Sequence, residues 1–275
     1  MLATMVIFAR ESLEASMIVA IILSYLRQIH RSDQALWVWA GIAAALAVDA
    51  GAGVIVWTTI HRYSGTPLQT GLEGTTYFMA ALILTGMSFW MKRQGRALKH
   101  QLQDGIDRTL ASSSKWPLAL LAAVTVGREG LETAVFVLAL TFRTAPGPLL
   151  LGAAAGLLLG FGMSYWLYRL GRRIPLRSFF TVFGVLLLVF ADALISDGVE
   201  DYQALRWIPW GRSVLWHTGR YLRESGAIGD VLHTFLGYAQ APSILQFSVY
   251  LGFLGAAVFL FLRSPGRRLA KSQTG

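Results

Sequence analysis

The amino-acid sequence predicts an all-α membrane protein whose chain crosses the bilayer several times. Of its 275 residues, 55% are hydrophobic and only 14% are charged, and the mean hydropathy is +0.52. A soluble domain carries roughly a quarter charged residues. Several apolar runs reach the roughly 20 residues that a helix needs to cross a bilayer. These runs are continuous rather than alternating, which excludes a transmembrane barrel.

Seven apolar segments are long enough to be transmembrane helices. In chain order they cover about residues 2–26, 35–60, 71–91, 116–142, 149–170, 179–195 and 243–262. No basic residue precedes the first segment, and Arg10 and Glu11 interrupt it, so we expect a first helix rather than a cleaved signal peptide. Ser243 and Gln246 have the spacing of a capping box at the head of the last helix.

Two further segments connect the predicted helices. Residues 93–115 are basic, and their leucine and isoleucine side chains recur on one helical face, which predicts an amphipathic helix at the cytoplasmic membrane surface. Residues 197–242 are expected to form an outer loop with one or two short amphipathic helices. This loop is either an ordinary interfacial segment or a surface that docks a partner.

The distribution of lysine and arginine predicts the orientation of the chain. If the connections after the first, third and fifth helices share one side with the C-terminal tail, that side collects 16 of the 24 basic residues, and the other side holds six. Basic loops remain in the cytoplasm, so we expect the N-terminus outside and the C-terminus in the cytoplasm. The net charge of +9 reflects this bias, and no nucleic-acid partner is expected.

One short charged motif occurs twice inside apolar surroundings. Residues 10–14 read Arg-Glu-Ser-Leu-Glu, and residues 128–132 read Arg-Glu-Gly-Leu-Glu. Each charged group at membrane depth costs roughly 2.5–3.5 kcal/mol on an insertion scale. The six groups would cost on the order of 15–20 kcal/mol before any pairing. Stability alone does not explain such a cost, so we expect the two motifs to be functional.

The position of the two motifs predicts an inverted repeat. The second motif lies in the third helix after the one that carries the first, so the two motif helices cross the membrane in opposite directions. We expect one repeat at about residues 1–92, a second at about 116–196, and an additional last helix at about 243–263, all in a single domain. Inverted repeats of this kind place a transporter's binding site near the bilayer midplane. The four glutamates should therefore converge there.

The motif residues favour binding of a hard cation. The two glutamates of each motif are three positions apart, hence neighbours on one helical face, and the arginine lies four positions before the second glutamate. The chain has no cysteine, so any metal must use oxygen or imidazole ligands. Carboxylate oxygens suit a hard, highly charged cation. Paired carboxylates also serve proton relays, and each arginine could simply hold its own glutamates together.

The two Arg-Glu-x-x-Glu motifs resemble those of the ferric iron permease family, the oxidase-dependent iron transporters, and its bacterial EfeU-type branch. The sequences Leu-Glu-Gly at 72–74, Phe-Trp-Met-Lys at 89–92 and Gly-Tyr-Ala-Gln-Ala-Pro-Ser at 237–243 add to this likeness. It extends over nearly the whole chain. One feature departs from the fungal members: the outer loop has only sparse acids, at Asp197, Glu200 and Asp201, and no dense acidic motif.

The resemblance implies a fold, a cargo and a set of site residues. It implies a multi-pass permease of the cytoplasmic membrane that imports Fe(III) as its substrate and holds no permanent cofactor. It implies Glu11, Glu14, Glu129 and Glu132 as metal ligands, with Arg10 and Arg128 supporting them. It also implies an iron-binding protein and an oxidase or peroxidase outside the membrane. Import of another cation, a divalent metal or lead, and an intramembrane carboxylate enzyme are the alternatives.

Three further acidic residues fall in the predicted helices. Asp49, in the middle of the second helix, is a candidate for the pathway or for proton coupling. Glu73 is either a ligand at the mouth of the pathway or an acid favoured by the dipole at a helix N-terminus. Asp192 is expected at the solvated outer end of the sixth helix.

Overall fold

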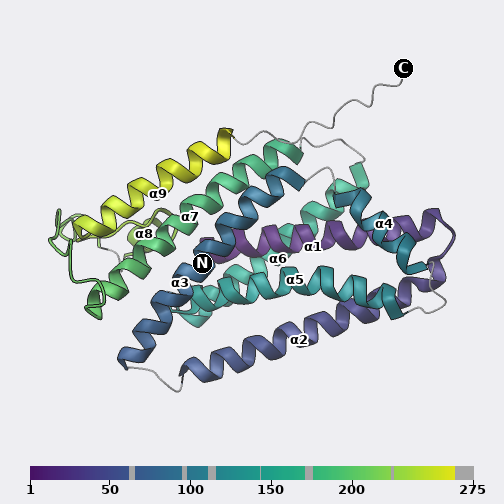
Figure 1. Ribbon diagram of the computed structural model, residues 1–275, viewed down its shortest axis with the longest axis horizontal. Coiled ribbons are helices and arrows are strands. Elements are labelled where there is room, and N and C mark those ends of the chain that lie inside the picture. Colours follow the sequence, from purple (N-terminus) through teal and green to yellow (C-terminus); the bar gives the residue numbers. More distant parts are fainter. Residues whose placement is uncertain are drawn as a thin grey trace. The chain divides into compact units, whose positions relative to one another are not determined.

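The computed structural model describes residues 1–61, 66–94, 98–110, 116–142, 144–170, 176–223 and 226–263, and the regular elements in these ranges are helices (Figure 1). In chain order they are α1 (Leu2–Gln28), the short 3-10 helix η1 (Ser32–Gln34), α2 (Ala35–His61), α3 (Pro67–Gln94), α4 (Leu98–Leu110), α5 (Trp116–Thr141), α6 (Pro146–Leu170), α7 (Leu176–Ala204), α8 (Ala227–Leu236) and α9 (Ile244–Arg263).

The long helices confirm an all-α, multi-pass membrane protein. Within the described ranges, α1, α2, α3, α5, α6, α7 and α9 each have between 20 and 29 residues. At 1.5 Å per residue, each is about 30 Å long or more, the thickness of a bilayer core. Four of them, α2, α6, α7 and α9, are also apolar enough to cross a membrane. The helices α1 and α5 are as long, and each carries the three charges of its motif.

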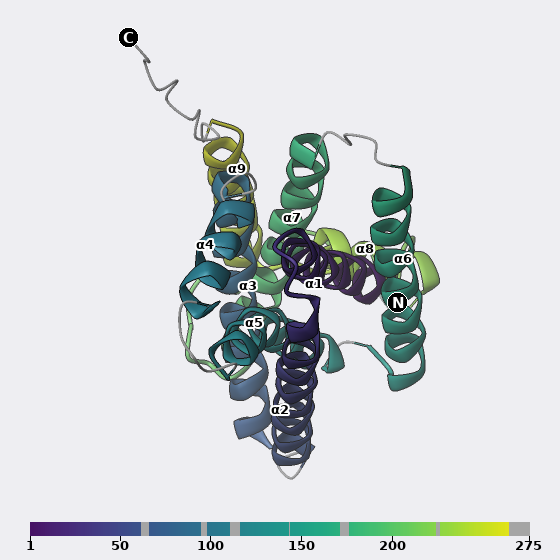
Figure 2. The same cartoon turned by 90° about the vertical axis from the view of Figure 1, so that its right-hand side faces the viewer.

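The chain divides into two compact units, and each is described by itself. The first holds residues 1–76 and 99–174, and the second holds residues 77–98 and 175–275. In the first unit α1 packs against α6 and α5, and α2 packs against α5. Figure 1 shows α5 running alongside α2, and in the turned view of Figure 2 the two helices again lie next to each other. In the second unit α7 packs against α8 and α9.

The predicted amphipathic helix in the basic linker is present as α4. Its side chains Leu102 and Ile106 are buried. Gly105 of α4 lies against the side chain of Leu121 in α5, so the apolar face is covered in part by protein. Leu98, the first residue of the predicted face, has a side chain outside the described part of the structure.

Two helices begin or end at other residues than the hydropathy predicts. α3 begins at Pro67 rather than near Gly71, because Thr66 caps it: the backbone N–H of Gln69 donates to Thr66 Oγ1 at 3.3 Å. α7 continues to Ala204 rather than ending at Ile195. Polar residues end the apolar segment there but do not stop a helix. The helix therefore ends nine residues later than predicted.

The segment that joins α7 to α9 is anchored by the sequence 237–243. Gly237 ends α8 in the left-handed conformation, with φ of +61°, and its N–H donates to the carbonyl of His233. The hydroxyl of Tyr238 donates to the carbonyl of Leu222 at 3.0 Å. The predicted capping box is present: Gln246 N–H donates to Ser243 Oγ at 3.0 Å, and Ser243 N–H donates to Gln246 Oε1 at 3.3 Å.

Candidate functional site

The first copy of the motif is buried in the first unit and is fully ion-paired. Arg10 on α1 is 1% exposed. Its Nη1 lies 2.7 Å from Glu11 Oε1, and its Nε lies 2.8 Å from Glu14 Oε1. The arginine also lies within Coulombic range of Glu129 and Glu132 on α5. One buried guanidinium thus faces all four motif glutamates.

The second copy of the motif is paired in the same way but is more open. Arg128 Nε lies 2.9 Å from Glu132 Oε1, the same four-residue spacing as between Arg10 and Glu14. The Arg128 side chain is 43% exposed, whereas that of Arg10 is 1% exposed. Equal sequence motifs therefore sit in unequal surroundings, since only the first arginine is enclosed by protein.

The packing of α1 against α5 brings three of the four predicted ligands together. One carboxylate oxygen from each of Glu11, Glu129 and Glu132 lies within 4.8 Å of the others. Oxygens bound to one calcium-sized ion, at 2.3–2.6 Å from it, can be up to about 5 Å apart. A cation of that size could contact all three, and a smaller one would need only a slight approach. Glu14 is not part of this group, because its Oε1 is paired with Arg10.

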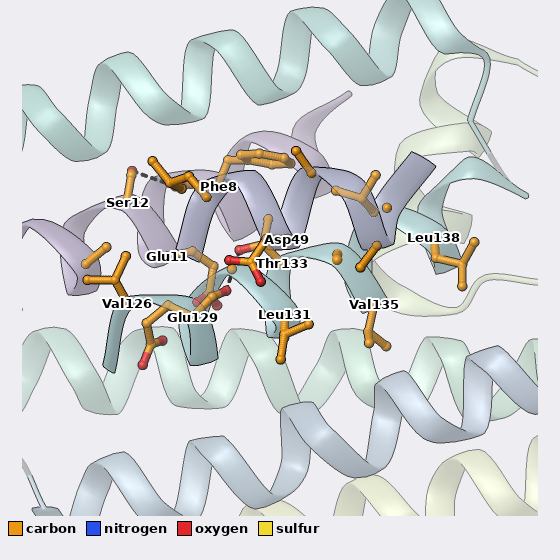
Figure 3. Close-up of a pocket in the computed structure, with 18 of the residues that line it drawn as sticks. Phe8, Glu11, Ser12, Asp49, Val126, Glu129, Leu131, Thr133, Val135 and Leu138 are labelled. Carbon is orange, nitrogen blue, oxygen red and sulfur yellow. Dashed lines mark hydrogen bonds between the residues drawn. The ribbon is translucent and has the colours of Figure 1, made fainter. Parts of the chain in front are cut away.

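A cavity of about 900 Å³ adjoins this carboxylate cluster within the first unit. Residues of α1, α2, α5 and α6 line it, and most of them are apolar. Its acidic lining residues are Glu11, Asp49 and Glu129. Figure 3 shows these three close together on the wall, with Leu138 away from them. The cavity therefore has one acidic region inside apolar walls, the form of a small binding site.

Asp49 lies directly over the second motif. A Cβ built on Gly130 would lie 1.8 Å from Asp49 Oδ2 and 2.6 Å from its Cγ, so the carboxylate occupies the space that any side chain at this position would need. Asp49 is 9% exposed, and its Oδ2 has no hydrogen-bond partner among the described residues. The sequence singles out Asp49, but it does not predict its contact with the central glycine of the motif.

The helix pairs α2–α5 and α6–α1 make equivalent contacts. A Cβ on Gly41 would meet the carbonyl oxygen of Ala119, and one on Gly152 would meet that of Met1. Eight residues further along α2, Asp49 lies over Gly130 of α5, and eight residues further along α6, Gly160 lies under the Ser12 hydroxyl of α1. A residue of α6 has a number 111 higher than its equivalent in α2, and a residue of α5 has a number 118 higher than its equivalent in α1. These two offsets hold for both contacts. The roles of the two helices are exchanged, because the polar residue is on α2 in one pair and on α1 in the other, but a polar group lies over a glycine in both pairs.

The two remaining acidic candidates lie outside the cluster. Glu73 accepts a 2.6 Å hydrogen bond from Gln69 Nε2 in the same helix. Because α3 begins at Pro67, Glu73 lies in its second turn, where the helix dipole has little effect. Asp192 is 0% exposed within α7, and neither of its carboxylate oxygens has a hydrogen-bond partner among the described residues. The expectation of a solvated helix end at Asp192 was therefore wrong.

Buried acidic side chains beside a cavity in a multi-pass helical protein mark a pathway for ions or protons, as in the class of cation permeases. Comparison with known proteins identifies the family: residues 1–264 match the model described as the iron permease FTR1 family, and the chain belongs to it. It is thus an iron transporter rather than an enzyme. The resemblance seen in the sequence is confirmed.

Curated relatives extend over nearly the whole chain. A ferrous iron permease EfeU from Escherichia coli O6:K15:H31 (strain 536 / UPEC) is 30% identical over 272 residues, which cover 96% of each chain. A ferrous iron permease EfeU from Yersinia pestis is 29% identical over 271 residues, covering 96% of this chain and 94% of that one. No solved structure matches.

Proposed function

We propose that this permease imports iron in its ferric form across the cytoplasmic membrane, and that Glu11, Glu129 and Glu132 hold the ion on its way. The observation that supports this site is the approach of three carboxylates from two helices to within 4.8 Å. Such convergence of three like charges is unfavourable in an apolar interior unless positive charge, from a bound cation, a proton or an arginine, compensates it. Oxygen ligands of this kind suit a hard cation such as iron(III).

The arginines have a supporting role in this proposal. Arg10 partly balances the negative charge of the carboxylates when no ion is bound. Its ion pair with Glu14 holds that glutamate apart from the three ligands, and Glu14 could bind the ion only after this pair breaks. Arg128 pairs with Glu132, and its more exposed position leaves Glu132 on the open side of the site. An incoming cation would compete with the two arginines for the glutamates.

Seven crossings, an outer N-terminus and a cytoplasmic C-terminus remain part of the proposal. The seven long helices and the distribution of basic residues support them. Delivery of iron by an external iron-binding protein together with an oxidase or peroxidase is the partner arrangement we infer from the family likeness. The names of the E. coli and Yersinia relatives make ferrous iron the second candidate cargo.

Uptake of radiolabelled iron into proteoliposomes tests the site. We expect Glu129→Gln, which keeps the side-chain shape and removes the charge, to lower uptake at least about tenfold, because one of three ligands loses its charge. Asp33→Asn is the matched control, since Asp33 is exposed in η1 and lies outside the cavity. Normal uptake by the Glu129→Gln variant would show that the cluster is not on the pathway.

A further inference from the structure

We propose that Asp49 is a fifth acidic group of the iron site and gives the cavity its preference for a trivalent over a divalent cation. This inference rests on the proposed function of the glutamate cluster and extends it to the choice of oxidation state. Three observations support it: the position of the Asp49 carboxylate, its lack of a hydrogen-bond partner among the described residues, and the summed formal charge of the two motifs and Asp49.

The position of Asp49 connects it with the site. It lines the same cavity as Glu11 and Glu129, and its carboxylate packs on Gly130, the residue between Glu129 and Leu131. In the equivalent contact of the other helix pair, the polar group over the glycine is the Ser12 hydroxyl. An uncharged polar group on the opposite helix can therefore make this kind of contact with a glycine. A carboxylate adds a negative charge that packing does not need.

The Asp49 carboxylate is not neutralised by its neighbours. Its Oδ2 is buried without a hydrogen-bond partner in the described ranges, and no ion pair to Asp49 is found there. Burying such a group in its ionised form costs several kcal/mol unless a cation or a bound proton compensates its charge. An acid on a cavity wall, nine-tenths buried and lacking a partner, indicates that its partner is a cation that enters the cavity.

The formal charges favour a trivalent ion. The four glutamates and two arginines of the motifs sum to −2 when all are ionised, which matches a divalent cation. Asp49 brings the sum to −3, which matches iron(III). In a cavity with apolar walls, an unbalanced charge is poorly screened, so matching of the total charge has a large effect on affinity. Removal of one negative charge weakens binding of a trivalent ion more than binding of a divalent one.

The test compares uptake of two forms of iron into proteoliposomes. Radiolabelled iron is supplied either as ferric citrate or, without oxygen and with ascorbate, as the ferrous ion. For Asp49→Asn we expect the ratio of ferric to ferrous uptake to fall at least about tenfold, while ferrous uptake changes little. Asp49→Glu keeps the charge and should keep a ferric preference. Asp33→Asn, which removes an exposed charge outside the cavity, should leave the ratio unchanged.

A second variant guards against misfolding of the first. Gly130→Ala keeps every charge but displaces the Asp49 carboxylate, so it should also lower the ratio. A ratio within about twofold of the wild-type value in both variants, or a parallel loss of both forms of iron in protein that elutes as a single folded species, would overturn the assignment of Asp49. If Glu129→Gln loses uptake of both forms of iron while Asp49→Asn keeps both, the proposed function holds and the role of Asp49 does not. Normal uptake by Glu129→Gln would instead remove the proposed function itself.

Discussion

The two motif arginines are equivalent in sequence but not in their surroundings. Arg10 is enclosed between Glu11 and Glu14, whereas Arg128 is 43% exposed and paired with Glu132. Removing one member of a buried ion pair leaves an uncompensated charge and costs about 3–5 kcal/mol. A pair that protein encloses less completely depends less on its partner. Substitution of the two arginines should therefore have unequal effects on stability.

We expect Arg10→Gln to lower the free energy of unfolding by about 3–5 kcal/mol, and Arg128→Gln to lower it less, because protein does not enclose the Arg128 guanidinium. Denaturant titration of each purified variant in the same detergent, followed by circular dichroism, measures both values. The variants are matched, because each removes one guanidinium from the same motif. Equal losses would show that both arginines are buried to the same extent in the membrane.

For single residues, the sequence identifies the important positions more reliably than it predicts the surroundings of those positions. The spacing of the motif correctly pairs each arginine with the second glutamate of its own copy. It cannot show that Glu14 remains with Arg10 while Glu11 joins the cluster, because this depends on how α1 packs against α5. Asp192 was misplaced for a similar reason: a polar residue near the end of an apolar segment need not lie at the end of a helix.

Close packing through glycine is the main feature of the helix pairs. Around Gly130 the three nearest atoms to a built Cβ all belong to the Asp49 side chain, whereas around Gly160 they include the carbonyl oxygen of Ala9 at 2.5 Å. A side chain can be shortened by mutation, but a backbone carbonyl cannot. The two glycines therefore differ in whether a second substitution can relieve the clash.

We expect Gly130→Ala to destabilise the protein by about 1–3 kcal/mol through overpacking, and Asp49→Ala in the same chain to relieve most of that loss. A double-mutant cycle on thermal or denaturant unfolding measures the coupling between the two positions. Gly160→Ala combined with Ser12→Ala is the comparison pair and should show little relief. Additive effects of Gly130→Ala and Asp49→Ala would indicate that the two residues do not touch.

The elements themselves follow well from local sequence signals. The capping box predicts the start of α9, and the amphipathic pattern predicts α4. The bounds of α3 and α7 were missed, since hydropathy reports where a chain is apolar and not where its backbone stays helical. Contacts between helices far apart in sequence, such as Asp49 over Gly130, need the packed structure, because no local pattern specifies them.

For the whole molecule, the open prediction is its orientation in the membrane. The basic residues gather in the connections that we assign to the cytoplasm, including the linker that contains α4. The segment between α7 and α8 has fewer and is assigned to the outside. Because the chain contains no cysteine, a single introduced thiol reports one position without interference.

We expect Ser213→Cys to react with a membrane-impermeant maleimide in intact cells, and Asp104→Cys to react only after the membrane is permeabilised. Both side chains are exposed in the structure, so neither should be protected by folding. Labelling of each variant in detergent provides the control for reactivity, and iron uptake confirms that each variant folds. Labelling of Asp104→Cys alone in intact cells would show that the orientation is the reverse of the one we assign. Equal labelling of both would instead place Asp104 and Ser213 on the same side of the membrane. The chain between them, which contains α5, α6 and α7, would then cross the membrane an even number of times, in contradiction to three crossings.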